Sequence, residues 1–484
     1  MKKVLFAATA AAVVFASSCK KESKETLGST QKELVTGSLV DTLKGNITVN
    51  TTVTRTTYLK GIVYVKPGVT LTVNAGVTIK GSFETTPTPD LINLENNKGT
   101  LIVEKGAKLI ANGTATSPIV WTSEKDAGSR DFGNWGGIVL LGQAPITTAT
   151  GATSNTFEAF TALPNESGQN NYGGTNAADN SGSITYNRID FAGGVVAAQN
   201  REVNGLTLCG VGSGTVLHHV EVSNSGDDAF EFFGGTVNAD HLLSYGNKDD
   251  DFDFDEGYNG RLQFIIGYRT DLADNSGSKL IELDNNSASA VFAGRSRTLP
   301  FIANATLIGP SSLTPRANDL AGNPIASPRF DQAIHVRRAG TIRFLNSIVS
   351  TSAYNATFMS TPSTDGSFFL DPTAAGASAV LNNLFEPATS AQKVRLASIE
   401  GDPAFPTSSY NSALEARFTA NGNSFLANYA AFKLGGALNP LTGSPALSGG
   451  FNLGPYGFVG TTQRGAVRST DVWTAGSWLS IAIH

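Results

Sequence analysis

The sequence predicts an all-β fold of the solenoid type, in which short strands stack as successive coils. Three observations predict it. Apolar and polar residues alternate over short segments, Gly or Pro-Gly interrupts these segments every few residues, and one segment recurs after 22 residues, from Phe230 to Phe252. Alternation with a period of two is typical of half-buried strands. A repeat of about 20–30 residues without helical periodicity is typical of a solenoid.

The composition favours β structure and excludes several other classes of protein. The chain has 484 residues, of which 52 are Gly, and only 15% are charged. Because 40% of the residues are apolar, the chain is not of the disordered class. The net charge of −5, without a long basic run, excludes a typical nucleic-acid-binding protein. The length is consistent with one repetitive domain, so several separate domains are not required.

Strand-like alternation begins near residue 58. The segment 58–81 contains three apolar pairs separated by tight corners, and similar short segments follow at 101–106, 108–113, 118–122 and 135–140. Residues 150–182 are rich in Gly, Asn, Ser and Thr, and residues 310–332 contain four Pro. We expect both to be long surface loops. Within the irregular region that follows, Ser412 to Phe418 is the one candidate helix.

The repeat predicts which residues lie on neighbouring coils. Gly226–Phe232 aligns with Lys248–Phe254, and His219-Val220 aligns with His241-Leu242 and then with Gln263-Phe264 at the same offset. Coils stacked about 4.8 Å apart would place the Phe columns in the interior. His218, His219 and His241 are close in this alignment, and they suit either a small metal site or hydrogen-bonded positions on the ladder.

The N-terminus predicts secretion and lipid anchoring. A basic start is followed by an apolar stretch, Val4 to Ala16, which is too short to span a bilayer but suits a secretory signal. The small residues before Cys19 resemble the cleavage site of bacterial lipoproteins, in which this Cys is acylated. We therefore expect a signal peptide at 1–18, a flexible tether at 19–42, and a single β-helix domain at 43–484 with irregular C-terminal coils.

The two cysteines support the same interpretation. If Cys19 carries the lipid, Cys209 is left without a partner for an internal disulfide. Cys209 lies in an apolar strand-like segment, so we expect it to be a small buried hydrophobic residue. The predicted membrane contact is therefore the lipid at Cys19, because no other stretch is long and apolar enough to cross a membrane.

Two segments resemble motifs of a family of Bacteroidota cell-surface lipoproteins. They are Gly226–Asn238 and Asp471–Gly476, and the charged run that follows Cys19 resembles the surface-export signal of such proteins. The resemblance covers about residues 60–470. It implies a right-handed parallel β-helix of the pectate-lyase-like type, located on the cell-surface side of the outer membrane. It implies no catalytic residue.

The strongest chemical signal is a concentration of acidic residues. Residues 248–256 contain six carboxylates, and those that alternate with Phe252 and Phe254 are expected to point outward. Aligning five apolar–polar–apolar triplets predicts one outward column along neighbouring coils. The members of this column are Thr207, Glu231, Asp253, Glu282 and His335, flanked by Asp255 and Asp284.

Ionised carboxylates stacked about 4.8 Å apart would repel one another by roughly 3–4 kcal/mol per pair at an effective dielectric constant of 20. A bound Ca²⁺, a shared proton or an Arg partner would relieve this repulsion, with Arg269 and Arg337 as candidates. A solvated face with splayed side chains would avoid it. The candidate Ca²⁺ ligands are Asp227, Asp249, Asp251, Glu231, Asp253, Asp255 and Glu282.

The same column is also a candidate catalytic site. Glu231, Asp253, Glu282 and His335 are the candidate catalytic residues. Carboxylates on adjacent coils would have about the 5 Å separation found in retaining glycosidases. A polysaccharide lyase would instead use Ca²⁺ to neutralise a uronate and an Arg or Lys as the base. Either enzyme needs a groove, for which the loops at 150–182 and 310–332 are the candidate walls.

Three functions remain open from the sequence. The first is a non-enzymatic binding or adhesion protein on the cell surface, with a polysaccharide ligand and a cation-structured acidic face. The second is a polysaccharide lyase or glycoside hydrolase that uses the stacked carboxylates. The third is an accessory subunit of a surface protein complex for nutrient uptake.

Overall fold

The computed structural model describes residues 41–481, with gaps at 84–92, 166, 199–200, 271, 274–276, 289, 316, 318–323, 326–328, 352–357, 361–378, 388–393, 397–408 and 411. Residues 39–484 form one compact unit. The predicted signal peptide, Cys19 and most of the tether lie outside the described residues. In the described part of the chain, no helix is both long and apolar enough to span a membrane.

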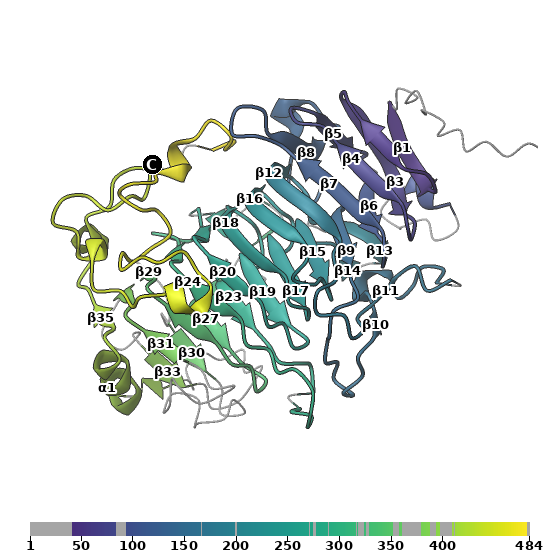
Figure 1. Ribbon diagram of the computed structural model, residues 1–484. Helices are drawn as coiled ribbons and strands as arrows, with labels where there is room; N and C mark the ends of the chain where they lie inside the picture. The colour runs from purple at the N-terminus through teal and green to yellow at the C-terminus, as the bar shows by residue number, and fades with distance from the viewer. Residues whose placement is uncertain are drawn as a thin grey trace, which may run out of the picture. The chain divides into compact units, whose positions relative to one another are not determined.

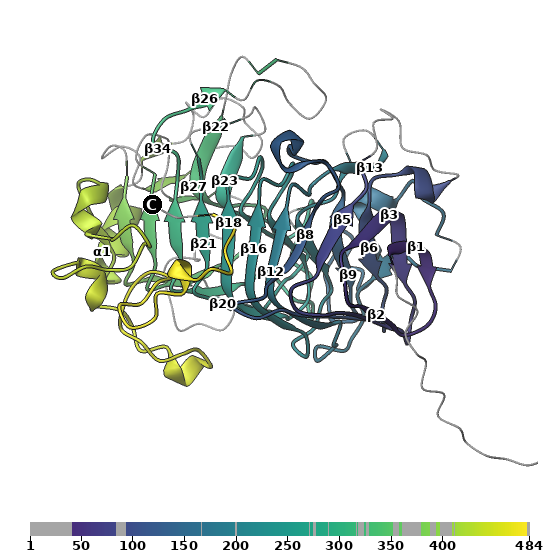
Figure 2. The ribbon, with the colours of Figure 1, turned by 90° about the horizontal axis from the view of Figure 1, so that it is seen from above.

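The fold is a right-handed parallel β-helix, as predicted (Figures 1 and 2). Among the described residues, 29 strands belong to one hydrogen-bonded sheet, and their pairings are parallel except for the β33–β34 pair (Val394–Leu396 and Ser409–Tyr410). The first coil contains β1 (Thr42–Ile47), β2 (Thr51–Val53) and β3 (Thr57–Val65). Each regular coil contributes three strand segments, so the strands form three columns.

The first column continues from the second half of β3 and carries the predicted acidic residues. Its strands are β6 (Thr100–Val103), β9 (Gly137–Leu141), β15 (Leu206–Cys209), β17 (Phe230–Phe233), β19 (Phe252–Asp255), β23 (Ser278–Leu283), β27 (Phe330–Val336), β30 (Phe358–Ser360) and β33.

The second and third columns share three long strands that bend between them, namely β12 (Gly182–Asp190), β16 (Val216–Ser223) and β18 (Asn238–Tyr245). The second column also contains β4 (Thr70–Val73), β7 (Lys108–Asn112), β20 (Arg261–Gln263), β24 (Phe301–Ala303), β28 (Arg343–Leu345) and β31 (Ala379–Leu381). The third contains β5 (Thr78–Gly81), β8 (Ile119–Ser123), β21 (Ile266–Tyr268), β25 (Thr306–Ile308), β29 (Ile348–Ser350), β32 (Leu384–Glu386) and β35 (Ser424–Phe425).

Stacked apolar side chains fill the interior of the coils. Phe230 lies on Phe252 with ring centroids 5.3 Å apart, and Phe232 lies on Phe254 at 5.0 Å. All four rings are fully buried. The 22-residue repeat therefore encodes an interior aromatic ladder. Burial of such side chains contributes about 1.5–3 kcal/mol each, which is a main source of stability in this fold.

The bend between the second and third columns is a ladder of single residues with left-handed backbone. These residues have φ between 51° and 59°, a conformation in which Asn and His are enriched among non-Gly residues. The members of the ladder are Tyr186, His219, His241, Phe264, Asn304, Asn346 and Asn382. Phe264 corresponds to His241, so this step is 23 residues and not the predicted 22. The turn between β19 and β20 contains one residue more than the turn of the preceding coil.

The segment 150–182 is not simply a surface loop. It contains the antiparallel pair β10 (Asn155–Thr156) and β11 (Asn171–Tyr172), and it buries Phe157, Phe160 and Tyr172 in an apolar cluster outside the coils. Phe233 and Cys209 belong to the same cluster, and Cys209 is fully buried as predicted. The remaining minor strands form the pairs β13 (Val195–Ala198) with β14 (Arg201–Glu202) and β22 (Leu272–Ala273) with β26 (Thr314–Pro315).

The predicted helix is present as α1 (Ser412–Ala420). After it, residues 429–481 form an irregular segment, here called the C-terminal strap, that returns along the bend ladder (yellow in Figures 1 and 2). Later strap residues contact earlier coils. The contacts are Asn346 Nδ2 to the Phe451 carbonyl at 2.8 Å, Gln263 Nε2 to the Val459 carbonyl at 3.0 Å, and Ser480 N to Glu221 Oε2 at 2.7 Å.

Candidate functional site

The five predicted column residues lie in register on adjacent strands of the first column. Thr207 lies opposite Glu231, Glu231 opposite Asp253, Asp253 opposite Glu282, and Glu282 opposite His335. The column points away from the coil interior, but it is not a solvated face. Glu231 and Glu282 are only 9% and 3% exposed. Among the alternatives left open by the sequence, a solvated face with splayed side chains therefore does not describe Glu231 and Glu282.

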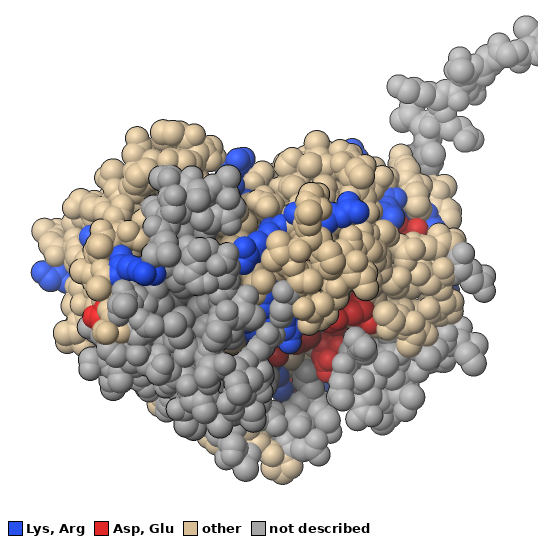
Figure 3. Space-filling view, turned by 90° about the horizontal axis from the view of Figure 1, so that it is seen from below, with Lys and Arg blue, Asp and Glu red and all other residues tan. Residues whose placement is uncertain are grey.

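Two insertions and the corners before β17 and β19 enclose the middle of this column in an acidic pocket of about 300 Å³. Figure 3 shows the acidic side chains gathered in a hollow, with basic side chains at its border. We refer to this site as the acidic pocket. Its lining residues are Glu158, Glu202, Asn204, Asp227, Asp228, Glu231, Asp249, Asp250, Asp253, Lys279, Glu282 and Arg337.

Within the described residues, nine carboxylates and two cationic groups line this pocket. Asp228, Glu231 and Asp253 each offer a carboxylate oxygen, and these oxygens lie within 4.8 Å of one another. Asp227, Asp228 and Asp249 form a second group with the same property. Asp228 belongs to both groups and therefore joins them. Carboxylate oxygens at this spacing suit a hard cation such as Ca²⁺, which binds six to eight oxygens at about 2.3–2.6 Å.

Burial and mutual repulsion strongly disfavour ionisation of these carboxyl groups. Burial, and next the charge of Asp253, raises the pKa of Glu231 well above its usual value. Burial, and next the charge of Asp227, does the same to the pKa of Asp228. For Asp253 the pKa is raised by burial and then by Asp250. Protonation or a bound cation would remove this electrostatic cost.

The side of the pocket near β23 carries its own cations. Glu282 forms ion pairs with Lys279 and Arg337, and Arg337 Nε also lies 2.7 Å from Asp284 Oδ1. Arg338 binds the other oxygen of Asp284 at 2.8 Å. Arg337 is thus an acid partner, as proposed from the sequence. Arg337 neutralises the charges of Glu282 and Asp284. Because Glu282 is already paired, it is a poorer cation ligand than Glu231 or Asp253.

Asp251 corrects a sequence-based prediction, because it points into the coil and not outward. Its side chain is fully buried, accepts a hydrogen bond from Ser244, and pairs with Arg269 Nε at 3.0 Å. Arg269 also donates to the Lys279 carbonyl at 2.7 Å. Asp251 precedes the first residue of β19, so the alternation of the strand does not determine its direction. It is therefore a structural ion-pair residue and not a candidate Ca²⁺ ligand.

Asp255 and His335 lie next to the pocket but do not line it. Asp255 pairs in register with Phe233, and burial raises its pKa to about 6. His335 is 8% exposed, and neither ring nitrogen has a hydrogen-bond partner in the described part of the chain. Burial, and next the charge of Lys279, lowers the pKa of His335, so its imidazole is neutral.

Several pocket residues were not among the predicted ligands. Asp228 and Asp250 belong to the Asp-Asp pairs of the 22-residue repeat, and this repeat was a signal that could have identified them. Their stacking is direct, because the Asp250 backbone N–H donates to Asp228 Oδ1 at 2.8 Å. Glu158 and Glu202 come from insertions, and no repeat predicts where an insertion folds. Of the two loops expected to wall a groove, 150–182 contributes Glu158, whereas no described residue of 310–332 lines the pocket.

The fold and the sequence together identify the class of protein. The chain matches the family model of the pectate-lyase-like β-helix domain over residues 43–429, so it belongs to that family. The match ends where the C-terminal strap begins. No curated protein matches the chain. Among solved structures, the Dettilon tailspike protein is similar at 11% identity with a TM-score of 0.21, and the match covers 72% of this chain and 62% of the tailspike chain.

Proposed function

We propose that this protein is a non-enzymatic binding β-helix whose acidic pocket holds Ca²⁺ and, through it, a glycan. The observation that carries this proposal is the imbalance of charge in the pocket, where nine carboxylates face Lys279 and Arg337. In addition, the buried Asp253 Oδ1 has no hydrogen-bond partner among the described residues. A divalent cation would contact that oxygen and neutralise two of the negative charges around it.

Asp228, Glu231 and Asp253 are the proposed primary ligands, because their oxygens lie within 4.8 Å of one another. Asp227 and Asp249 would support a second ion or the outer coordination positions. Three carboxylates leave several of the six to eight Ca²⁺ positions for water or for a ligand. Sugar hydroxyls and uronate carboxylates supply the oxygen ligands that Ca²⁺ prefers. An acidic polysaccharide is accordingly the expected ligand class.

A glycan array probed with the full chain tests this function. We expect binding in about 1 mM Ca²⁺, a range that suits extracellular calcium modules, and loss of binding in chelator. The double variant Asp228→Asn/Asp253→Asn should lose calcium-dependent binding. Asp126→Asn, an exposed carboxylate outside the pocket, is the matched control and should retain it. Glycan binding that persists in chelator, or in the double variant, would refute the proposal.

A glycoside hydrolase is the second candidate, favoured by one observation. The oxygens of Glu231 and Asp253 lie within 4.8 Å, near the roughly 5–5.5 Å of retaining enzymes, and the raised pKa values suit a general acid. This candidate predicts release of reducing ends from a polysaccharide, abolished by Glu231→Gln. A lyase would instead release unsaturated uronates, with Lys279 or Arg337 as the base. A bound glycan that remains intact favours the binding protein.

The proposed location is the surface side of the outer membrane, with a lipid at Cys19 as the anchor. Such a protein would present its pocket to extracellular polysaccharide, and it would also suit an accessory subunit of a surface complex. Labelling with a radioactive fatty acid should mark the wild type and the Cys209→Ala variant. Cys19→Ala should remain unlabelled and leave the membrane fraction. Equal labelling of Cys19→Ala would exclude this anchor.

A further inference from the structure

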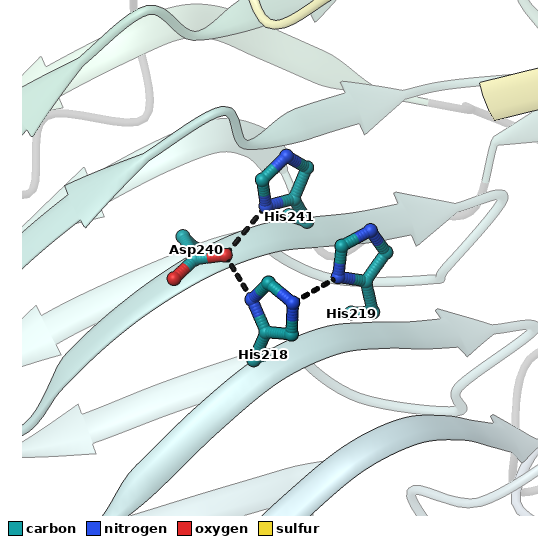
Figure 4. Close-up of side chains that lie close together, drawn as sticks. All are labelled: His218, His219, Asp240 and His241. Atoms are coloured by element: carbon teal, nitrogen blue, oxygen red, sulfur yellow. Dashed lines mark hydrogen bonds and ion pairs between the residues drawn. The ribbon is translucent and has the colours of Figure 1, made fainter. Parts of the chain in front are cut away.

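A second cluster of ligating side chains lies outside the acidic pocket, on the bend between the second and third columns. His218 and Asp240 are register partners on β16 and β18. His219 and His241 are the next residues, and both have left-handed backbone with φ of 53° and 54°. In a regular strand, consecutive side chains point to opposite faces. Here the left-handed residue turns the chain, so that both members of each pair converge on one side (Figure 4).

The four side chains form a continuous chain of contacts (Figure 4). Asp240 Oδ1 contacts His218 Nδ1 and lies 2.5 Å from His241 Nδ1. His218 Nε2 lies 2.7 Å from His219 Nδ1. The rings of His219 and His241 are stacked, with centroids 4.2 Å apart and planes 7° apart. The 22-residue repeat thus places three imidazoles and one carboxylate in a single group.

One set of neutral tautomers satisfies every contact in this group. His218 and His241 each donate an Nδ1–H to Asp240, and His219 donates its Nδ1–H to His218 Nε2. A metal ion would displace the protons held between these groups, because it binds ring nitrogens through their lone pairs and the carboxylate in its ionised form.

The surroundings of this group are those of a half-open site. On one side the C-terminal strap places Trp473 5.2 Å from the His241 ring and Trp478 5.3 Å from the His219 ring. On the other side a pocket of about 490 Å³ is lined by His218, Asp240 and His241, among other residues of the coils and the strap. A ligand can therefore reach the group from the pocket, while the indole rings shield the opposite face.

We propose that His218, His219, Asp240 and His241 form a Zn²⁺ site, separate from the acidic pocket. Three imidazoles and one carboxylate are the ligand types and number of a tetrahedral zinc centre. Each residue offers one ligand atom, and the four atoms lie within 4.8 Å of one another. Tetrahedral zinc with bonds of about 2.1 Å needs its ligand atoms about 3.4 Å apart. Small rotations of exposed side chains reach that spacing, because His218 and Asp240 side chains are 36% and 41% exposed.

The site has a structural consequence for the fold. Its ligands come from two neighbouring coils, and the strap covers two of them through Trp473 and Trp478. Zinc would therefore join the coils at the bend and fix the surface on which the end of the strap packs. The acidic pocket, with oxygen ligands only, is suited to Ca²⁺, whereas nitrogen ligands select zinc and similar transition metals.

Calorimetric titration of Zn²⁺ into the full chain tests the site, in buffer containing about 1 mM Ca²⁺ to occupy the acidic pocket. We expect one zinc per chain and binding at least ten-fold weaker in His219→Ala and in His241→Ala. His335→Gln changes a histidine of β27 that is not part of the cluster and is the matched control, and Asp228→Asn/Asp253→Asn should bind zinc as the wild type does. Unchanged zinc binding in both cluster variants would overturn the proposal.

A spectroscopic readout covers the case in which a cluster variant unfolds. Cu²⁺ occupies nitrogen-rich zinc sites because it binds more tightly than Zn²⁺, and it quenches nearby indole emission. In the folded wild type we expect Cu²⁺ to quench tryptophan fluorescence, and we expect chelator to restore it. Asp240→Asn, the most conservative change, should weaken this quenching at least five-fold. Wild-type protein that shows no quenching with equimolar Cu²⁺ would also overturn the zinc site.

Discussion

The two sides of the acidic column differ in how their charge is neutralised. Glu282 and Asp284, near β23, are paired with Lys279, Arg337 and Arg338. Around β17, in contrast, Asp228 and Glu231 have mainly other carboxylates as charged neighbours, and their pKa values are raised by burial and by those neighbours. Near β23, Lys and Arg side chains of the chain itself neutralise the carboxylates. Around β17, a bound cation or protons would have to supply the positive charge.

The largest expected effect is at the buried ion pair between Asp251 and Arg269, which lies inside the coil next to the acidic column. Arg269→Met would leave Asp251 fully buried without its guanidinium partner. Removing one member of a buried ion pair costs about 3–5 kcal/mol of the free energy of unfolding. Urea denaturation measures this loss. The double variant Arg269→Met/Asp251→Leu should recover much of it, and a single variant as stable as the wild type would show that the pairing is not needed.

The opposite sign is expected on the carboxylate-rich side. In calcium-free buffer, Asp228→Asn removes one repelling charge and keeps an oxygen to accept from the Asp250 N–H. We expect the free energy of unfolding to rise by about 1 kcal/mol, on the scale of one pKa unit. The same variant should lose the increase in Tm that calcium gives the wild type. If Asp228→Asn instead lowers stability in calcium-free buffer, the charge of Asp228 stabilises the fold and is not a source of repulsion.

The pH dependence of stability shows whether protons or calcium relieve the repulsion among the carboxylates of the acidic pocket. Burial, and next the neighbouring carboxylates, raises the pKa of Asp228 and Glu231 in the pocket well above the usual value, and burial, with Asp255, raises that of Glu256, outside the pocket, to about 7. The folded chain then holds protons that the unfolded chain releases above about pH 4.5. Stability of the calcium-free protein should therefore fall as pH rises from 4.5 to 8, by at least about 1.4 kcal/mol, which is the value of one pKa unit.

Calcium should make this decline shallower, because it binds the deprotonated carboxylates and its affinity rises with pH. Urea denaturation at a series of pH values, with calcium and with chelator, measures both slopes. Identical slopes under the two conditions would show that protons alone relieve the repulsion.

The smallest effect is expected at Glu256, which lies outside the acidic pocket. Tyr172 donates to Glu256 Oε2 at 2.7 Å, and Asn155 donates to Oε1 at 2.8 Å. Glu256→Gln keeps one acceptor oxygen, so the free energy of unfolding should change by less than about 1 kcal/mol. The fall in stability between pH 5 and 8 should also become smaller. A loss above about 3 kcal/mol would mean that Glu256 acts as a paired anion.

The sequence predicts where a site residue lies more accurately when the residue is within a strand than when it is at a corner or in an insertion. The apolar–polar–apolar triplets place Glu231, Asp253 and Glu282 in the correct register, because interior packing enforces a period of two. Asp251 lies one residue before β19, where the alternation of the strand no longer applies, and it pairs with the buried Arg269. Glu158 is brought to the pocket by an insertion whose apolar residues form a separate cluster. Such contacts between distant segments leave no local pattern.

Calorimetric titration of Ca²⁺ into chelator-treated full-length protein tests whether the acidic pocket binds a cation. We expect saturable binding in the micromolar to millimolar range, lost in Asp228→Asn/Asp253→Asn and retained in Asp126→Asn. The Arg-paired carboxylates are intact in all three proteins, so the comparison isolates the carboxylate-rich side of the acidic pocket. Absence of binding by the wild type, or equal binding by the double variant, would contradict the claim that this pocket is a cation site.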